Sequence, residues 1–399
     1  MKSRTPVYDG AAHHRSPRPQ LNGEALVQEG AVIARQRSVV LVLACRLVAA
    51  LQLGLSGLSA VSLVAALLAC EGPSPQAGTV TEFDTPTSGS APAGIVSGPD
   101  GNLWFTENLG NKIGRLTTAG VITEYPVPST LEAPGSIAVG PGGALWFTTG
   151  VWSIGSITTS GTITEYPVPG ASAALLEGVA GITSGPDGNL WFTKEFGNKI
   201  GRITTAGAVT EFTVPTTVPD SPITGTSSAP HGIASGPDGN LWFTESKGNK
   251  IGCITTSGVI TEFALPTGGA YPEGITAGPD GNLWFTEGSG RIGRITTGGT
   301  IMEFTVPTEE SGPSGIVAGP DGNLWFTESA SNVYHPSGAG RIGRITPSGT
   351  ITEFAFPTID PPTSIAAGSD GNVWFTEFGH SDPTGKLFLG GNKIGRITP

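Results

Sequence analysis

The residues that decide the fold read Gly-Pro-Asp-Gly-Asn-Leu-Trp-Phe-Thr-Glu at 236–245, followed by Lys-Ile-Gly-Cys-Ile-Thr at 250–255. The same order of residues returns along the chain at intervals of 41 to 51 residues. Its Trp-Phe pair occurs seven times, with the tryptophans at Trp104, Trp146, Trp191, Trp242, Trp284, Trp325 and Trp374. A period of this length indicates a repeat architecture in which each copy forms one structural unit.

Around this stretch, each copy contains four short segments, which in the copy quoted cover residues 231–235, 240–245, 250–255 and 259–263. They are rich in Ile, Val, Thr, Phe and Trp and are bounded by Gly, Pro, Asp and Ser, which is typical of strands. No stretch after Cys70 shows a sustained helical period. We therefore predict an all-β fold, a seven-bladed β-propeller of four-stranded blades.

The two ends of the repeat array predict how the ring closes. The first recognisable segment, residues 79–83, resembles a fourth strand with no blade before it. The last copy stops at residues 397–399, directly after its third strand. We expect the N-terminal strand to complete the last blade, because this pairing removes the exposed edges of an open array.

The lengths of the connections distinguish the two faces of the ring. From the first-strand isoleucine to the second-strand tryptophan there are nine residues in every copy, as from Ile233 to Trp242, and the turn at 98–101 fits a type I turn with a glycine bulge. Connections at the opposite end vary, with the longest at residues 214–230, 329–340 and 378–392. A constant scaffold with variable loops on one rim predicts binding or catalysis at that rim.

Composition excludes several classes of protein. The 399 residues carry a net charge of −11, and an acidic chain without a basic stripe is not expected to bind nucleic acid. Three cysteines cannot build a disulfide framework, and we interpret Cys253 as a small strand residue without a partner. The sequence has no phosphate loop, serine nucleophile elbow or paired-cysteine zinc motif.

The N-terminal segment predicts export. Residues 1–46 are rich in Lys and Arg, and residues 47–69 are uncharged and mostly apolar before Cys70. This pattern resembles a lipoprotein signal with Cys70 as the lipidated residue, and an uncleaved signal anchor is the alternative. We expect a signal or anchor at 1–70, a linker at 71–78 and a monomeric propeller at 79–399. It would be a membrane-anchored, periplasmic or extracellular protein that meets the membrane only through its N-terminal anchor.

Two ionisable residues occur at the start of the innermost strands, beside the expected central channel. There the seven copies present Ala93, Gly135, Ala180, His231, Glu273, Ser314 and Thr363. Because His231 and Glu273 belong to adjacent blades, the two side chains could converge. A histidine beside a carboxylate suits a metal ion, or a general base with its orienting partner. A hydrogen-bonded pair that lines a wet channel is the structural alternative.

A second set of side chains follows each Trp-Phe-Thr. We expect these groups to point toward the loop rim and to be mainly structural, with their carboxylates accepting hydrogen bonds from the next turn. Glu245 stands out because it shares a blade with His231. The set is Glu107, Thr149, Lys194, Glu245, Glu287, Glu328 and Glu377.

Four further residues of the rim loops are candidates for ligand contact. Tyr271 and Tyr334 could stack on a ligand, and His335 and His380 belong to the long loops. The alternative for a loop histidine is simple exposure to solvent.

The repeat resembles the streptogramin B lyase (virginiamycin B lyase) family, from about residue 79 to residue 399. The resemblance implies a seven-bladed propeller that opens a cyclic depsipeptide antibiotic by elimination. In that family a magnesium ion held by rim carboxylates polarises the substrate carbonyl, and a histidine of a Pro-His-Gly-Ile segment moves the proton. That histidine corresponds to His231, and Glu245 matches a metal carboxylate. The chain has Ala180 and Ala229 where the family carries a second histidine and a glutamate, and Glu273 could compensate.

Two functions follow from these observations. The first is a lyase-like enzyme for antibiotic resistance, with Mg²⁺ on Glu245 and Glu273 and with His231 as acid and base. The second is a non-catalytic exported propeller that binds a glycan, peptide or cell-wall ligand through its loops.

Overall fold

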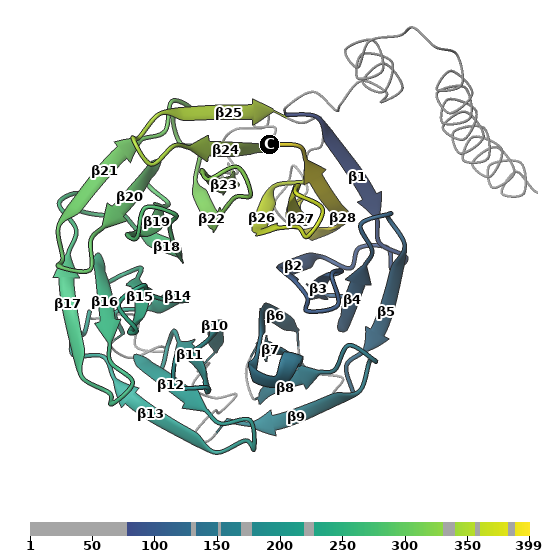
Figure 1. Ribbon diagram of the computed structural model, residues 1–399, viewed down its shortest axis with the longest axis horizontal. Coiled ribbons are helices and arrows are strands. Elements are labelled where there is room, and N and C mark those ends of the chain that lie inside the picture. Colours follow the sequence, from purple (N-terminus) through teal and green to yellow (C-terminus); the bar gives the residue numbers. More distant parts are fainter. Residues whose placement is uncertain are drawn as a thin grey trace, which may run out of the picture. The chain divides into compact units, whose positions relative to one another are not determined.

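The computed structural model describes residues 78–128, 133–150, 153–168, 178–218, 227–329, 340–355, 360–381 and 388–399. These residues form seven four-stranded antiparallel sheets arranged in a ring (Figure 1). They belong to the second of two compact units, Gln76–Pro399. Within the described ranges, no helix has the length and apolarity needed to cross a membrane. The predicted signal or anchor and nearly all of the predicted linker lie outside the described residues.

Each blade follows the same order, with its first strand nearest the axis and its fourth at the periphery (Figure 1). The first three blades are β2 (Pro92–Ser97), β3 (Leu103–Glu107), β4 (Lys112–Leu116) and β5 (Ile122–Pro126); β6 (Pro134–Val139), β7 (Leu145–Thr149), β8 (Ser153–Ile157) and β9 (Ile163–Pro167); and β10 (Val179–Ser184), β11 (Leu190–Lys194), β12 (Lys199–Ile203) and β13 (Val209–Thr213). A short 3-10 turn, η1 (Pro141–Gly143), lies between β6 and β7.

The remaining four blades repeat this pattern. They are β14 (Pro230–Ser235), β15 (Leu241–Glu245), β16 (Lys250–Ile254) and β17 (Ile260–Ala264); β18 (Pro272–Ala277), β19 (Leu283–Glu287), β20 (Arg291–Ile295) and β21 (Ile301–Thr305); β22 (Pro313–Ala318), β23 (Leu324–Glu328), β24 (Arg341–Ile345) and β25 (Ile351–Ala355); and β26 (Pro362–Ala367), β27 (Val373–Ser381), β28 (Phe388–Ile397) and β1 (Val80–Asp84).

The ring closes as the sequence predicts. Strand β1 pairs antiparallel with β28, with Val80 opposite Ile397 and Asp84 opposite Lys393. The seventh blade therefore combines the first described strand with the last three, and the predicted closure is confirmed. Because this pairing covers the edge of β28, each of the described sheets has its fourth strand at its outer edge.

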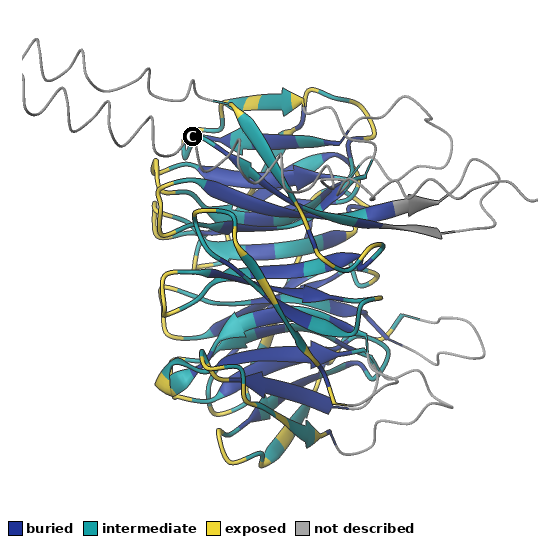
Figure 2. Cartoon of the chain, turned by 90° about the vertical axis from the view of Figure 1, so that its right-hand side faces the viewer, coloured by how far each residue is buried: buried dark blue, intermediate teal, exposed yellow. Residues whose placement is uncertain are grey.

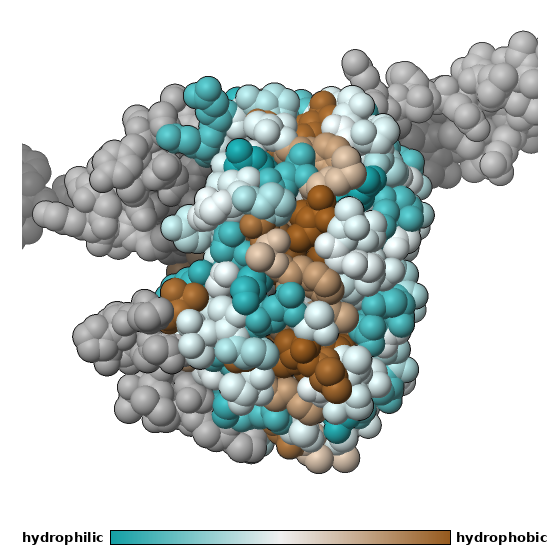
Figure 3. Space-filling view, turned by 90° about the vertical axis from the view of Figure 1, so that its left-hand side faces the viewer, coloured by the Kyte–Doolittle hydropathy of each residue, from teal (hydrophilic) through white to brown (hydrophobic). Residues whose placement is uncertain are grey.

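The core lies between neighbouring blades. Trp104 of the first blade is buried with Ile137, Leu145 and Phe147 of the second, and its ring stacks on Tyr125 of its own outer strand with centroids 5.6 Å apart. The recurring Trp-Phe pairs are therefore packing residues, as the sequence indicates. The outer wall seen in Figure 3 is mixed in polarity, and its exposed large apolar side chains include Val259 and Met302.

The turns of constant length form a hydrogen-bonded end face, with exposed residues at their tips (Figure 2). In the first blade Gly101 has a φ of +75° and donates to Gly98 O, as expected for a type I turn with a glycine bulge. The carboxylate of Asp100 accepts from Trp104 Nε1 at 3.0 Å. Burial favours a raised pKa for Asp100, but the hydrogen bonds from Asn102 and Trp104 outweigh it and lower the pKa below its ordinary value.

One predicted loop is partly a hairpin. Residues 378–392 were expected to form a long loop, but β27 continues to Ser381 and β28 begins at Phe388. Gly379 pairs with Gly390 and His380 pairs with Leu389 across this extension. The length of the connection from Trp374 to Gly395 indicated a loop, whereas backbone pairing across the hairpin continues the two strands.

Candidate functional site

The site candidates occupy a β-bulge that recurs at the start of every innermost strand. In the fourth blade Pro230 lies opposite Glu245 and Ile233 opposite Phe243, so His231 and Gly232 together face one residue. That residue is Thr244, and its Oγ1 accepts a 2.9 Å hydrogen bond from Gly232 N. The bulge bends the strand and sets the position of His231 near the axis.

The same threonine hydroxyl links each blade to the next. Thr193 Oγ1 donates to His231 O at 2.6 Å, and Thr244 Oγ1 donates to Glu273 O at 2.7 Å. Seven such bonds run round the ring, from Thr106, Thr148, Thr193, Thr244, Thr286, Thr327 and Thr376. No role for these threonines was evident from the sequence. The sequence does show a threonine after every Trp-Phe pair. Only the structure of the bulge shows that its hydroxyl joins one blade to the next.

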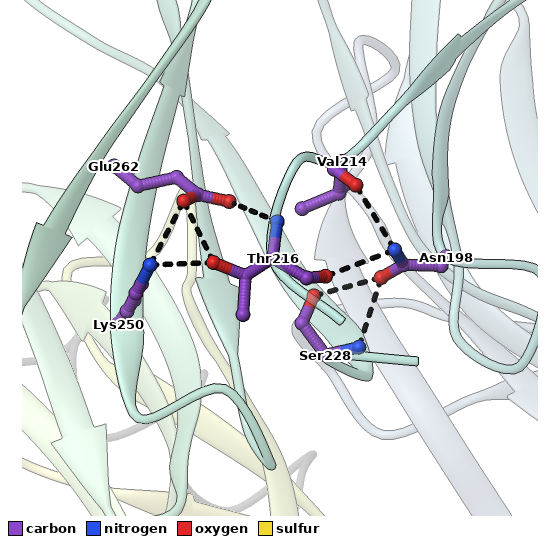
Figure 4. Close-up of polar contacts among 6 residues, drawn as sticks. All are labelled: Asn198, Val214, Thr216, Ser228, Lys250 and Glu262. Carbon is purple, nitrogen blue, oxygen red and sulfur yellow. Dashed lines mark hydrogen bonds and ion pairs between the residues drawn. The ribbon is translucent and has the colours of Figure 1, made fainter. Parts of the chain in front are cut away.

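The segment that leads into His231 is anchored to the preceding blade. Ser228 donates from both its backbone N and its Oγ to Asn198 Oδ1, each at 2.9 Å (Figure 4). The amide group of Asn198 donates in turn to the carbonyl oxygens of Val214 and Thr216 at 3.0 Å. His231 therefore follows a segment whose backbone is fixed by polar contacts across two blades.

A second set of contacts continues this network outward. Thr216 donates from its backbone N and from its Oγ1 to the carboxylate of Glu262, at 2.8 and 2.7 Å (Figure 4). Lys250 forms an ion pair with the same carboxylate at 2.9 Å. The connection between the third and fourth blades is thus attached at both of its ends.

His231 lies in β14 and is partly buried. Its Nδ1 is buried and has no hydrogen-bond partner among the described residues. Glu273 occupies the equivalent position of the adjacent strand β18, and Gly232 lies so close that a Cβ there would come within 2.2 Å of Glu273 O. The backbone next to His231 therefore packs closely against Glu273, but the described contacts include no hydrogen bond or ion pair between the side chains of His231 and Glu273.

Glu245 lies inside its blade rather than on the rim surface, since its exposed fraction is 0%. Burial first, and then the negative charge of Glu262, raise its pKa to about 7, while the nearby Ser228 hydroxyl opposes both effects. An uncharged Glu245 beside an ionised Glu262 is the arrangement that this environment favours.

The other members of the set behave alike, which supports the structural interpretation. Burial first, and then an outer-strand glutamate, raises the pKa of Glu107, Glu287 and Glu328 to about 8. In the third blade Lys194 replaces the buried acid and forms an ion pair with Glu211 at 2.8 Å. These acids thus lie near an outer-strand carboxylate, and in the described structure their oxygens do not accept the hydrogen bonds that we expected from the turn amides.

As they lie, Glu245 and Glu273 do not form a fitting donor set for magnesium. Mg²⁺ needs near-octahedral oxygen ligands and usually keeps several waters, whereas Glu245 is wholly enclosed. The carboxylate of Glu273 extends over its own blade, with Oε1 3.6 Å from the point where a Cβ on Gly288 would begin. No group of three or more metal-binding side chains occurs in the described part of the chain. The magnesium site remains a prediction.

Of the four candidates for ligand contact, two lie within the described residues and two do not. Tyr271 precedes β18 and is 56% exposed. His380 belongs to the extension of β27, and Tyr334 and His335 lie outside the described residues.

Comparison with known proteins identifies the family. The Virginiamycin B lyase family model matches residues 72–221 and 217–399. Curated virginiamycin B lyases from Bordetella parapertussis and Staphylococcus aureus are 47% and 45% identical over 45 residues, which is 11% of this chain. The matched segment spans only 15% of the length of those curated relatives.

Solved structures extend the similarity to the whole propeller. A streptogramin B lyase structure is 38% identical, with a TM-score of 0.69, over 80% of this chain and 97% of the other. A catalytically inactive histidine-to-alanine variant of virginiamycin B lyase from Staphylococcus aureus, with quinupristin, is 36% identical with the same TM-score, over 80% and 99% of the two chains. On the family match and the seven closed blades, this chain belongs to the virginiamycin B lyase family.

Proposed function

We propose that this propeller is a carbon–oxygen lyase that opens an ester-containing cyclic peptide by elimination. The observation that carries the proposal is the Pro-His-Gly-Ile segment at 230–233, which places His231 near the axis with an unpartnered Nδ1. Family membership supports the reaction class, and the solved relative that a histidine-to-alanine change inactivates supports a histidine as its centre.

The elimination chiefly requires a correctly placed base. A neutral imidazole nitrogen accepts the proton from the carbon adjacent to the one that carries the ester oxygen. The C–O bond then breaks, its electron pair leaves with the carboxylate, and a C=C bond forms, so no water is consumed. The bulge at His231 and the threonine bonds on either side hold the imidazole-bearing backbone in place for this transfer. No step is assigned to a metal.

The test uses the full chain and quinupristin. Ring opening by elimination leaves the mass of the peptide unchanged, whereas hydrolysis adds one water, so mass spectrometry with chromatography separates the two reactions. We expect His231→Ala to lower turnover by at least about 100-fold, the usual contribution of a general base. Ser314→Ala, at the same position two blades away, is the matched control and should retain full turnover.

Separate assays with added Mg²⁺ and with EDTA test whether turnover depends on the metal. Turnover that EDTA abolishes and Mg²⁺ restores would support a magnesium site that the described side chains do not complete as they lie. Turnover of the peptide that His231→Ala does not affect would contradict the proposal.

A second candidate function rests on two substitutions. Ala180 and Ala229 stand where the family resemblance implies a second histidine and a glutamate. Their small apolar side chains favour a propeller that binds a ligand without converting it. Binding of quinupristin by calorimetry with no product after prolonged incubation would favour this function over the lyase.

A further inference from the structure

Asn198 uses every hydrogen-bonding group of its side chain. Its amide nitrogen donates to Val214 O and Thr216 O, both at 3.0 Å, and its Oδ1 accepts from Ser228 N and Ser228 Oγ, both at 2.9 Å (Figure 4). A primary amide has two N–H donors and two acceptor lone pairs, so all four are engaged. The residue is only 5% exposed. Asn198 therefore fixes both described ends of the connection between the third and fourth blades.

The main chain between Ser228 and His231 has little freedom to move. Ser228 O accepts from Lys247 N at 3.0 Å. Pro230, directly before the histidine, has its φ fixed by its ring. At the far end of the segment, Thr193 Oγ1 donates to His231 O at 2.6 Å. A displacement at Ser228 is therefore passed along a short, stiff segment to His231.

Ala229 lies in this segment with a strained backbone. Its φ is +56°, a region that residues other than glycine rarely adopt, and such a conformation persists only where the surrounding contacts determine it. Ala229 N donates to Ser227 Oγ at 2.9 Å, and Ala229 O accepts from Ser246 N at 3.0 Å. Loss of the side-chain contacts at Ser228 would let Ala229 relax toward an ordinary φ. That rotation would turn the residues that follow, including His231.

The repeat provides matched positions for comparison. Asn111 of the first blade has a φ of +49°, against +51° for Asn198, but the next blade has Gly135 at its innermost position, without a side chain. In the fifth blade Gly290 takes the place of the asparagine, and its O accepts the matching backbone hydrogen bond from Val306 N at 3.1 Å. The turn thus tolerates glycine, and Asn198 is the member of this set that leads to His231.

We propose that Asn198 is a positioning residue for His231, acting through Ser228 and the strained Ala229 and not by contact with the substrate. This inference rests on the proposed function, since the position of His231 affects turnover only where its imidazole is the base. A base must lie within hydrogen-bond distance of the proton that it removes, so a small displacement slows the transfer. Binding of the ligand by the rim is left intact, and the loss therefore falls on kcat rather than on KM.

The test compares variants of the full chain. Asn198→Gly removes the amide, and glycine adopts a φ of +51° without strain. Asn111→Gly is the matched control, because it makes the same change at a φ of +49° in the first blade. Ser228→Ala removes the Oγ bond to Asn198 and keeps the backbone bond. It also replaces Asn198→Gly in the test if that variant does not fold.

The first measurement follows His231 directly and needs no turnover. In protein labelled with ¹³C at the histidine Cε1 atoms, the NMR signal that is lost in His231→Ala belongs to His231. We expect Asn198→Gly to shift or broaden this signal and Ser228→Ala to change it in the same way but less. Asn111→Gly should leave it unchanged. Melting temperatures show that each variant is folded.

The second measurement is the turnover of quinupristin. We expect Asn198→Gly to lower kcat by at least about tenfold and to change KM by less than about twofold, because a misplaced base slows the proton transfer without weakening binding. Ser228→Ala should lower kcat by about threefold, and Asn111→Gly should leave it within about twofold of the parent.

Each outcome has a defined meaning. An unchanged His231 signal in either variant of the contact would overturn the proposal, as would equal changes in Asn198→Gly and Asn111→Gly. A raised KM at unchanged kcat would also overturn it, since it would assign Asn198 to ligand binding. If the parent chain does not turn over quinupristin, the lyase function fails, whereas the NMR comparison still decides whether Asn198 positions His231.

Discussion

At the scale of single residues, one hydroxyl per blade connects the ring to the candidate site. Thr193 Oγ1 accepts from Gly181 N at 2.8 Å and donates to His231 O at 2.6 Å, with its own side chain fully buried. The residue types at the site were predictable because His231 and Glu273 differ from their counterparts in the other blades. The role of the threonines was not predictable, because the same residue occurs in every blade and no difference between blades points to it.

Replacement of Thr193 by valine should therefore destabilise the fold. The change keeps the shape but leaves Gly181 N and His231 O without their side-chain partner, which we expect to lower the free energy of unfolding by about 2–3 kcal/mol. Urea denaturation measures this effect. Thr164→Val, on the exposed side of β9, is the control and should stay within about 0.5 kcal/mol. An equal loss in both variants would contradict this role of the hydroxyl.

At the scale of the element, the enrichment in β-branched and aromatic residues and the bounding turn residues predicted the strands of the quoted copy to within about a residue. The turn at 98–101 was predictable because proline and glycine each fix a backbone angle. The direction of the Glu245 side chain was not predictable. It was expected to point toward the rim, but it belongs to a strand that is buried on both faces. The extension of β27 and β28 was missed because the length of a connection does not show whether its two ends pair with each other.

The buried acids of the second strands should make stability depend on pH. In the folded state burial and the charge of Glu303 raise the pKa of Glu287 to about 8, from an ordinary value of 4.5. The folded chain thus keeps a proton that the unfolded chain has lost, and the stabilisation present below pH 4.5 is lost as pH rises through 8. The slope reaches about 1.4 kcal/mol per pH unit for one such group.

The variant Glu287→Gln, which cannot ionise, should flatten this dependence. We expect near wild-type stability at pH 5 and a smaller loss toward pH 8.5, measured by urea denaturation across that range. Glu309→Gln, at an exposed position, is the control. A pH profile that Glu287→Gln leaves unchanged would show that this acid is ionised in the folded protein.

At the scale of the whole molecule, the pairing of β1 with β28 determines whether the ring is closed. Thr81 lies opposite Arg396 in the closing blade, just as Thr210 lies opposite Arg202 within the third blade. The two pairs occupy the same place in the repeat and differ mainly in the length of chain between their members. Closure was predictable because the unmatched first segment and the incomplete last copy add up to one blade.

A disulfide across the closing pair should stabilise the protein more than one across the matched pair. In the chain-entropy view, a cross-link between residues 81 and 396 is worth up to about 6 kcal/mol, against about 3 kcal/mol for one between 202 and 210. The variants are Thr81→Cys with Arg396→Cys, and Arg202→Cys with Thr210→Cys, each with Cys45 and Cys70 replaced by serine. Melting temperatures under oxidising and reducing conditions give the comparison. Equal gains would contradict the view that closure joins distant parts of the chain.

The threonine bridge has a consequence for how new specificities arise. It attaches to the main chain, at the carbonyl of each innermost residue, so the bond between blades does not depend on which side chain occupies that position. Seven such positions, one in each blade, therefore surround the axis on the same backbone scaffold. A substitution there, as from alanine to histidine, can therefore change the chemistry at the mouth of the channel while the threonine bonds between blades stay in place.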